Sequence, residues 1–267
     1  MLRPRERAGR ILALRQRLPG LVLLALLLGI WEWAGRRASD YVLAPPSEVL
    51  RAIPGMISSG LLPHAVATSL QDLAVGFALA AVVGVAVGFA MGWWPWVGRL
   101  LNPYVSAFYV VPVVALIPLI IIWIGFSSWA RVSVIFLFSV FEILLNAYAG
   151  IRAVEPTLLD VARTFGASRS QLLGRVVLPG SLPYTLVGLR LGASRAIKGM
   201  ITAELIFALT GLGGLLFRYK DQYETAQMLA VVVTLTCIGV VISAAIQLVE
   251  RRLLRWRPAL GRGARHR

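Results

Sequence analysis

Side chains that could perform covalent chemistry are scarce in this sequence. The single cysteine, Cys237, lies in an apolar run, so the chain can form no intramolecular disulfide and no cysteine-based metal cluster. The only histidines, His64 and His266, stand alone in a predicted outer loop and in the basic tail. The phosphate-binding pattern G-x-x-x-x-G-K-[ST] is absent. These absences argue against an enzyme and against an ATPase site in this chain.

Acidic residues are also few, since 12 Asp and Glu stand against 27 Lys and Arg and give a formal net charge of +15. Such a charge could indicate a nucleic-acid partner. However, 58% of the residues are hydrophobic and the mean hydropathy is +0.77. No basic face with interleaved aromatic residues lies outside the apolar runs, so we expect no nucleic acid as partner.

Long apolar runs are what the sequence has in abundance. Six of them approach or exceed the ~20 residues with which a helix crosses ~30 Å of hydrocarbon. They cover residues 18–34, 73–91, 104–124, 132–151, 184–207 and 226–249. The runs are continuous, without the period-two alternation of a β-barrel strand. They predict an all-α membrane protein with six transmembrane helices and no second soluble domain.

Basic residues are distributed unevenly around these runs. With the N-terminus inside, the cytoplasmic parts hold 18 Lys and Arg and the outer loops hold six, Arg131 among them. This asymmetry follows the positive-inside rule and predicts that both termini are cytoplasmic, in contact with the lipid bilayer. We therefore divide the chain into a basic tail (1–17), a six-helix domain (18–250) and a second basic tail (251–267).

Prolines and glycines give local predictions. Pro45-Pro46 before Ser47 and Glu48 indicates that a short surface helix starts there in the outer loop. Pro112 and Pro118 are expected to kink the third apolar run. The glycines of GFALAAVVGVAVGFAMG are spaced for close helix packing rather than for phosphate binding.

A polar segment at about 155–179 separates the fourth and fifth runs. Its first part has one apolar stripe at helical spacing, formed by Leu158, Val161, Ala162 and Phe165. Gly166 suits the left-handed position that closes a helix, and Ser168 with Gln171 predicts a capping box for a second helix, which Pro179 should end. This cytoplasmic helix-turn-helix either lies on the bilayer or docks a soluble partner.

The same segment resembles the signature loop of bacterial ABC importer permeases, whose pattern is E-A-A, three residues, G, nine residues and I-x-L-P. Asp160-Val161-Ala162 stand at the E-A-A positions, Gly166 follows at the right distance, and Val176-Val177-Leu178-Pro179 close the pattern. Asp160 replaces Glu and Val161 replaces Ala. The resemblance implies that the segment is a coupling helix seated on a separate ATPase, with these residues involved: Asp160, Ala162, Arg163, Gly166, Ala167, Leu178 and Pro179.

Further stretches are similar to the nitrate, sulfonate and taurine permease branch, namely APPSEVL, ALIPL, LLNAYAG, LPYTLVGLRLG and TGLGGLLF. The resemblance implies the ABC importer type I permease fold in a bacterial inner membrane. It also implies a homodimer that assembles with two ATPase subunits and receives substrate from an extracytoplasmic binding protein. This chain would then hold no cofactor, because ATP and magnesium would be bound by the partner ATPase.

Charged residues inside the apolar runs mark a candidate substrate path, because charges at membrane depth usually face a protein interior or a cavity. Arg195 and Lys198 lie near the middle of the fifth run, beside a face of small residues, and would make the passage electropositive. Glu142, in the fourth run with Asn146 one turn beyond it, could instead pair with either base. Tyr109 could offer a stacking face or simply pack.

These features leave the substrate open. An organic or inorganic anion such as nitrate, sulfonate or taurine follows from the resemblance. An aromatic or heterocyclic acid or vitamin precursor is the alternative, because Tyr109, Glu142 and Lys198 depart from that branch. Two other classes remain: a secondary transporter that uses Glu142, Arg195 and Lys198 for ion coupling, and a membrane scaffold without transport.

Overall fold

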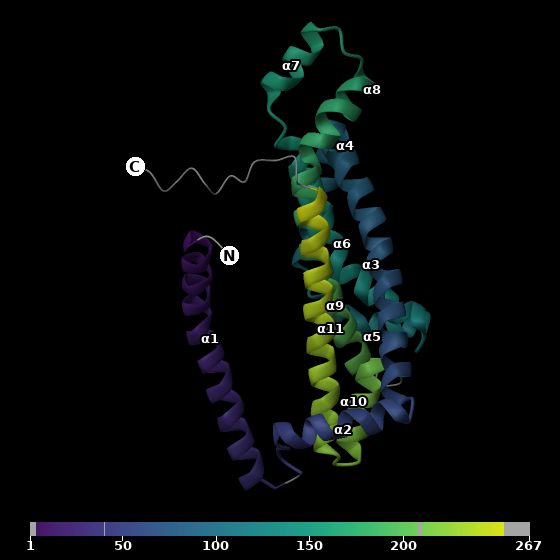
Figure 1. Ribbon diagram of the computed structural model, residues 1–267. Helices are drawn as coiled ribbons and strands as arrows, with labels where there is room; N and C mark the ends of the chain where they lie inside the picture. The colour runs from purple at the N-terminus through teal and green to yellow at the C-terminus, as the bar shows by residue number, and fades with distance from the viewer. Residues whose placement is uncertain (1–3, 40, 208–209, 254–267) are drawn as a thin grey trace. The chain divides into compact units, whose positions relative to one another are not determined.

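The computed structural model describes residues 4–39, 41–207 and 210–253, and the regular secondary structure in these residues is entirely helical (Figure 1). The helices are α1 (Pro4–Arg37), α2 (Pro46–Ser58), α3 (Leu61–Trp93), α4 (Pro95–Val110), α5 (Val113–Ile124), α6 (Ser128–Arg152), α7 (Pro156–Thr164), α8 (Arg169–Leu172), α9 (Leu178–Phe207), α10 (Gly211–Asp221) and α11 (Thr225–Leu253). A π-helical turn, Leu173–Val177, joins α8 to α9.

The chain forms two compact units. The first comprises Met1–His64 and Leu215–Thr234, and the second comprises Ala65–Gly214 and Leu235–Arg267. In the first unit, the carboxylate of Glu32 on α1 accepts hydrogen bonds from the backbone N–H (3.0 Å) and the hydroxyl (2.8 Å) of Ser47. Pro46 has no N–H, so Glu32 caps the first donor of α2. The predicted short helix near Ser47 is thereby confirmed.

Four helical stretches in the described residues are long and apolar enough to cross a membrane: Leu61–Trp93, Ser128–Arg152, Arg169–Phe207 and Thr225–Leu248. The pair α4 and α5 adds a fifth if it forms one span. The first predicted run, 18–34, lies within α1, which begins at Pro4 and so also covers most of the predicted N-terminal tail. The all-helical membrane fold is confirmed, and the number of six spans stays a prediction.

The third predicted run, 104–124, is broken rather than kinked. α4 and α5 meet at an angle of 95°. Val111 between them is extended, with ψ 125°, because the ring of Pro112 disfavours a helical residue before it. Pro118 lies inside α5 without ending it. The expected pair of kinks is therefore one sharp corner at Pro112.

Helix α6 packs closely against α9 in the second unit, and glycines of both α3 and α9 face it. On α3, added Cβ atoms at Gly76, Gly84 and Gly92 would meet side-chain atoms of α6 at 3.0 Å or less. On α9, an added Cβ at Gly188 would lie 2.6 Å from Asn146, and one at Gly192 would lie 2.5 Å from Ile143. The predicted role of these glycines in close helix packing is confirmed.

The turn after α7 has the hydrogen bonds of a Schellman motif. Gly166 has a positive φ of 77°, its N–H donates to Arg163 O (2.8 Å), and Ala167 N–H donates to Ala162 O (3.1 Å). The hydroxyl of Ser168 then accepts from Gln171 N–H, and the Gln171 side chain accepts from Ser168 N–H, so the capping box forms. The helix-turn-helix predicted from these residue types is present, with its side of the membrane left as a prediction.

Pro179 does not end the second helix of this segment, contrary to expectation. The helical path continues from Arg169 to Phe207, with Pro179 in the first turn of α9. In an α-helix the proline ring would clash with the carbonyl four residues earlier. The π-turn before it widens the helix, and Leu178 N–H donates to Leu173 O, five residues back. The wider turn lets the helix pass the proline.

The left-handed residue of the tip gives a first prediction. Gly166→Ala should destabilise the turn by about 1 kcal/mol, because a Cβ disfavours this conformation. Trypsin should then cleave after Arg163 and Arg169 faster by roughly fivefold. Gly174→Ala is the matched control, because nothing lies within 4 Å of its added Cβ and its φ is not in the left-handed range. Equal cleavage rates for both variants would contradict this account.

Candidate functional site

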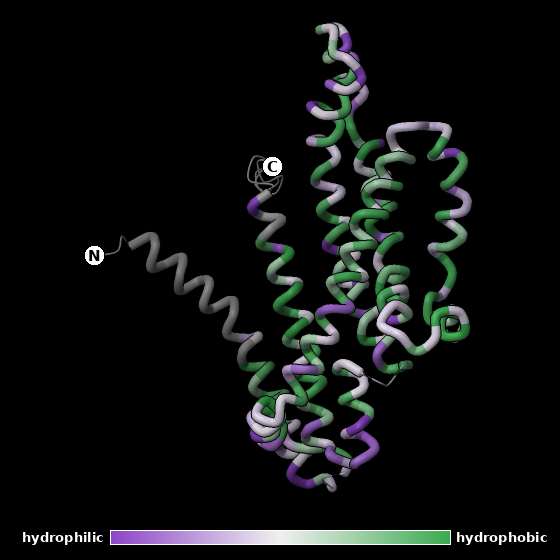
Figure 2. The backbone as a smooth tube through the Cα atoms, turned by 90° about the vertical axis from the view of Figure 1, so that its right-hand side faces the viewer, coloured by the Kyte–Doolittle hydropathy of each residue, from purple (hydrophilic) through white to green (hydrophobic). Residues whose placement is uncertain are grey.

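The helix-turn-helix from α7 to α8 forms a tip at one end of the second unit (Figure 1). Figure 2 shows this tip with hydrophilic and mixed colours, above long helices that are mostly hydrophobic. The apolar stripe of α7 lies uncovered, since Leu158 is 54%, Val161 49% and Phe165 87% exposed. The face of the following turn is covered, with Leu172 and Val177 buried. The tip therefore presents one apolar surface outward.

Polar groups flank this stripe. Asp160 and Arg163 form an exposed ion pair along α7, with 3.0 Å between Oδ1 and Nη1. The turn brings these residues together with Ala162, Gly166 and Ala167. Leu178 and Pro179, which complete the signature pattern, lie farther along at the start of α9. The segment thus combines an exposed surface with a continuous helical connection to α9.

A second cluster lies where α4, α6 and α9 approach one another. Glu142 Oε1 accepts from Arg195, with Nε and Nη2 both at 3.0 Å, and from the hydroxyl of Tyr109 at 3.3 Å. The side chain of Glu142 is 15% exposed and that of Arg195 is 49% exposed. The sequence left open whether Glu142 pairs with Arg195 or with Lys198, and the structure pairs it with Arg195.

This cluster opens into a pocket of about 400 Å³ next to the corner between α4 and α5. Four aromatic side chains line it with the ion pair: Phe108, Tyr109, Phe138 and Phe141. The side chains that line the pocket are apolar apart from one carboxylate, one guanidinium and one hydroxyl. Such a composition suits a small organic molecule that is held by a few directed polar contacts.

Two other residues predicted for the path lie differently. The side-chain amide of Asn146 donates to Glu142 O within α6 (2.8 Å), so it is used inside its own helix. Asn146 also lies against Gly188 of α9. Lys198 is exposed, and in the described part of the chain it makes no hydrogen bond or ion pair. The structure thus joins Tyr109, Glu142 and Arg195 but not Lys198.

Sequence reasoning missed a buried ion pair. Arg131 was counted in an outer loop, but it lies in the first turn of α6, 5% exposed, with Nε 2.6 Å from Asp72 Oδ2 on α3. Its Nη2 also donates to Ser128 (2.8 Å). Asp72 and Arg131 each stand directly before an apolar run. The sequence alone therefore could not distinguish them from charged residues in a loop.

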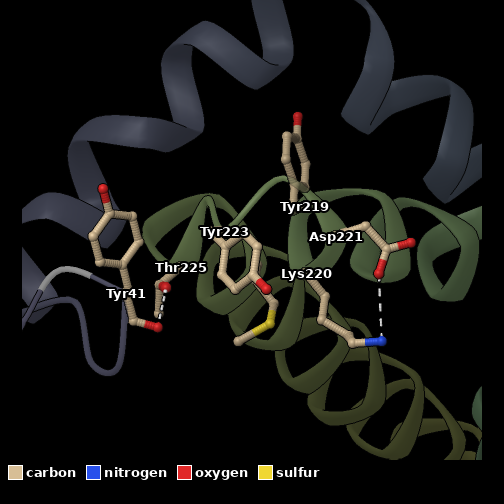
Figure 3. Close-up of a pocket in the computed structure, with 7 residues that line it drawn as sticks. Tyr41, Tyr219, Lys220, Asp221, Tyr223 and Thr225 are labelled. Carbon is tan, nitrogen blue, oxygen red and sulfur yellow. Dashed lines mark hydrogen bonds and ion pairs between the residues drawn. The ribbon is translucent and has the colours of Figure 1, made fainter.

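A further pocket lies in the first unit, around the turn between α10 and α11 (Figure 3). Its volume is about 410 Å³, and its walls include Tyr41, Tyr219 and Tyr223. The rings of Tyr41 and Tyr223 meet edge to face, 6.2 Å apart, and Thr225 donates to Tyr41 O (3.1 Å). Tyr223 has a positive φ of 58°, an uncommon conformation for a bulky residue. No motif in the sequence pointed to this pocket.

Residues 79–255 match the family described as binding-protein-dependent transport system inner membrane component. The matched region contains both the tip formed by α7 and α8 and the cluster around Glu142. The chain belongs to this family, as a permease of the ABC importer type in the sulfonate and taurine branch.

Named relatives cover almost the whole chain. A probable ABC transporter permease of Brucella melitensis is 33% identical over 238 residues, which are 89% of this chain and 97% of the relative. The taurine transport permease TauC of Escherichia coli is 32% identical over 241 residues, 87% of each chain. The formylaminopyrimidine transport permease ThiX of Halalkalibacterium halodurans is 31% identical over 243 residues, 91% of this chain and 97% of the relative.

The fold is shared with a chain of the MetNI methionine ABC transporter, solved in inward-facing conformations. That chain superimposes with a TM-score of 0.64 and 20% identity, covering 73% of this chain and 97% of the other. The protein is accordingly a multi-pass membrane transport subunit, and ATP hydrolysis belongs to partner chains. The family implies an ATPase and a substrate-binding protein as partners, which removes the secondary-transporter and scaffold alternatives.

The ion pair between Glu142 and Arg195 can be tested by a double-mutant cycle. Glu142→Gln and Arg195→Gln should each lower the free energy of unfolding, and the double variant should recover about 1 kcal/mol, a modest value because Arg195 is half exposed. Denaturation of the purified protein in detergent measures this. The same cycle with Lys198→Gln should give no coupling, and a coupling equal to that of Arg195 would contradict the pairing.

Proposed function

We propose that this chain is the permease subunit of an ATP-driven importer, and that the tip from α7 to α8 is its ATPase-coupling segment. The observation that carries the proposal is the uncovered apolar stripe of Leu158, Val161 and Phe165 on a polar tip. A helix lying on the bilayer would bury that stripe in lipid, whereas a projecting tip offers it to a cleft in a soluble partner. Asp160 and Arg163 beside it would make the polar contacts at the rim.

The family and the charge distribution support the assembly that we propose around it. Two copies of this chain would form the passage, two ATPase subunits would bind ATP and Mg²⁺, and an extracytoplasmic binding protein would deliver the substrate. In this proposal the tip and both termini lie on the cytoplasmic side, and the uneven distribution of Lys and Arg supports that orientation. ATP-driven closure of the ATPases would move the tip, and the uninterrupted helix from Arg169 to Phe207 would carry that movement past Arg195.

The substrate passage would include Tyr109, Glu142 and Arg195, with Asn146 and Lys198 farther along the same helices. Because Glu142 neutralises Arg195, the cluster is no simple anion site. An organic anion that carries a second polar group, as a taurine-like sulfonate does, could open the pair and satisfy both partners. Lys198 would supply the unpaired positive charge. The taurine permease TauC among the relatives supports this class.

The aromatic lining favours a second candidate, a flat aromatic or heterocyclic acid or vitamin precursor. Three phenylalanines and Tyr109 offer ring faces and edges in a pocket of about 400 Å³. The relative ThiX, named as a formylaminopyrimidine permease, supports this candidate.

The coupling assignment predicts the effect of a charge on the tip. Phe165→Asp should weaken retention of the ATPase encoded with this chain by about tenfold or more, because a carboxylate would replace an apolar contact. Co-purification and ATP hydrolysis after co-expression measure this. Val42→Asp is the matched control, since Val42 is also exposed (75%) but lies between α1 and α2. Full retention by a folded Phe165→Asp variant would remove the coupling assignment.

The two substrate classes predict opposite patterns in uptake. For a taurine-like sulfonate, Arg195→Gln should lower uptake of labelled taurine by about tenfold, and Tyr109→Leu should change it by less than about twofold. For a flat aromatic acid, Tyr109→Leu should be the more damaging substitution in uptake of that compound. Cells that express the complete transporter serve for both measurements. Uptake that neither substitution alters would exclude this pocket from the passage.

A further inference from the structure

The first turn of α10 receives its caps from other helices. The N–H of Leu212 donates to the hydroxyl of Ser69 on α3, and the N–H of Gly213 donates to Glu204 Oε2 on α9, both at 2.9 Å. These N–H groups belong to the donors that a helix start leaves without an intrahelical acceptor. We call Ser69, Glu204 and these two N–H groups the α10 cap. Both side chains are buried, with Ser69 at 0% and Glu204 at 2% exposure.

Glycine makes the close approach of the carboxylate possible. Gly211 has a positive φ of 72°, and an added Cβ there would clash with Glu204 Oε1 and lie 2.8 Å from Ser69 Oγ. An added Cβ at Gly213 would clash with Glu204 itself. The GLGG stretch in TGLGGLLF is therefore shaped around the side chain of Glu204.

The two acceptors are themselves firmly fixed. Ser69 stands one turn before Asp72 on α3, and Asp72 is bound to Arg131 at the start of α6 by the buried ion pair. Glu204 lies on α9, whose glycine face packs against α6 along its length. The cap therefore joins the start of α10 to one closely packed body of α3, α6 and α9. If the start of α10 moved away from Ser69 and Glu204, two buried N–H groups would be left without acceptors. This is costly in free energy where little water is present.

We infer that Glu204 is a positioning residue that makes α10 follow the movement of α9 during transport. The inference rests on the proposed function, because the movement is the one that the coupling tip imparts to α9. The helical path from Arg169 to Phe207 runs from the tip to Glu204 without a break. α10 then continues to Asp221, and its last turn lines the tyrosine pocket of Figure 3. Glu204 thus lies on the helical path that starts at the tip, and it caps the start of α10.

Spin-label distances between the two copies in the reconstituted complex with its ATPase test this link. With Cys237 replaced by serine, one label goes on the tip at Arg169→Cys and, in a separate sample, one goes just after α10 at Gln222→Cys. Both positions are exposed. ATP with vanadate is the probe, because it traps the ATPase without requiring the substrate. In the natural chain we expect trapping to shift the distances at both positions.

Glu204→Ala should abolish the distance shift of the label after α10 and leave that of the label on the tip. The tip label should still shift, whereas the label after α10 should give a broad distribution that trapping does not change. Glu204→Gln keeps an oxygen acceptor for Gly213 N–H and should restore the shift. Glu48→Gln, an exposed carboxylate in the first turn of α2, is the matched control. If Glu204→Ala does not yield a folded complex, Ser69→Ala removes the other acceptor with little change in volume and should reduce the shift after α10.

The outcomes distinguish this inference from the proposed function. If the tip label of the natural complex does not respond to trapping, the coupling assignment fails. If the tip responds but the label after α10 does not, α10 is independent of α9 and the inference fails. It fails equally if a folded Glu204→Ala complex shifts after α10 as the natural chain does, or if Ser69→Ala does so where Glu204→Ala does not fold.

Discussion

The close contact of α6 with glycines on both of its neighbours is the constraint on which the second unit depends. Without a hydrophobic force between helices in lipid, stability comes from packing at short range, which small residues permit. Gly76, Gly84 and Gly92 bring α3 against one side of α6, and Gly188 and Gly192 bring α9 against another. Because α9 is held this closely, Arg195 reaches Glu142, and the end of α9 holds Glu204 beside Ser69. Both polar sites are consequences of the same packing.

A second constraint concerns helix ends. Backbone donors near a membrane must find acceptors inside the protein when water is scarce. Here the starts of α2 and α10 are both capped by a carboxylate from the long helix that precedes them, Glu32 for α2 and Glu204 for α10. In each case a side chain on a long helix accepts a hydrogen bond from an N–H group at the start of a short helix. Acidic residues are few in this chain, and two of the 12 serve in this way.

The sequence predicted the local features whose causes are local. The capping box at Ser168, the left-handed Gly166 and the helix start after Pro45 depend on a few neighbouring residues, and all three are present.

Features that depend on distant partners were not predictable. The choice of Arg195 over Lys198 is set by how α6 and α9 are rotated against each other, and Arg131 could be recognised as buried only once α3 had supplied Asp72. The effect of a proline could not be predicted either. The chain turns by 95° at Pro112, whereas the helix continues past Pro179 after a wider, π-helical turn.

That wider turn has a consequence for helical phase. A π-turn holds about one residue more than the α-helical turn it replaces, and one residue corresponds to about 100° of rotation about the axis. Compared with an unbroken α-helix, the π-turn at Leu173–Val177 therefore rotates the tip about the helix axis by about this angle relative to Arg195 and Glu204. The direction in which the tip faces depends on the number of residues between Arg169 and Leu178. Deletion of Gly174, where an added Cβ would meet nothing within 4 Å, would turn the tip about the axis of α9 without removing a buried or capping residue.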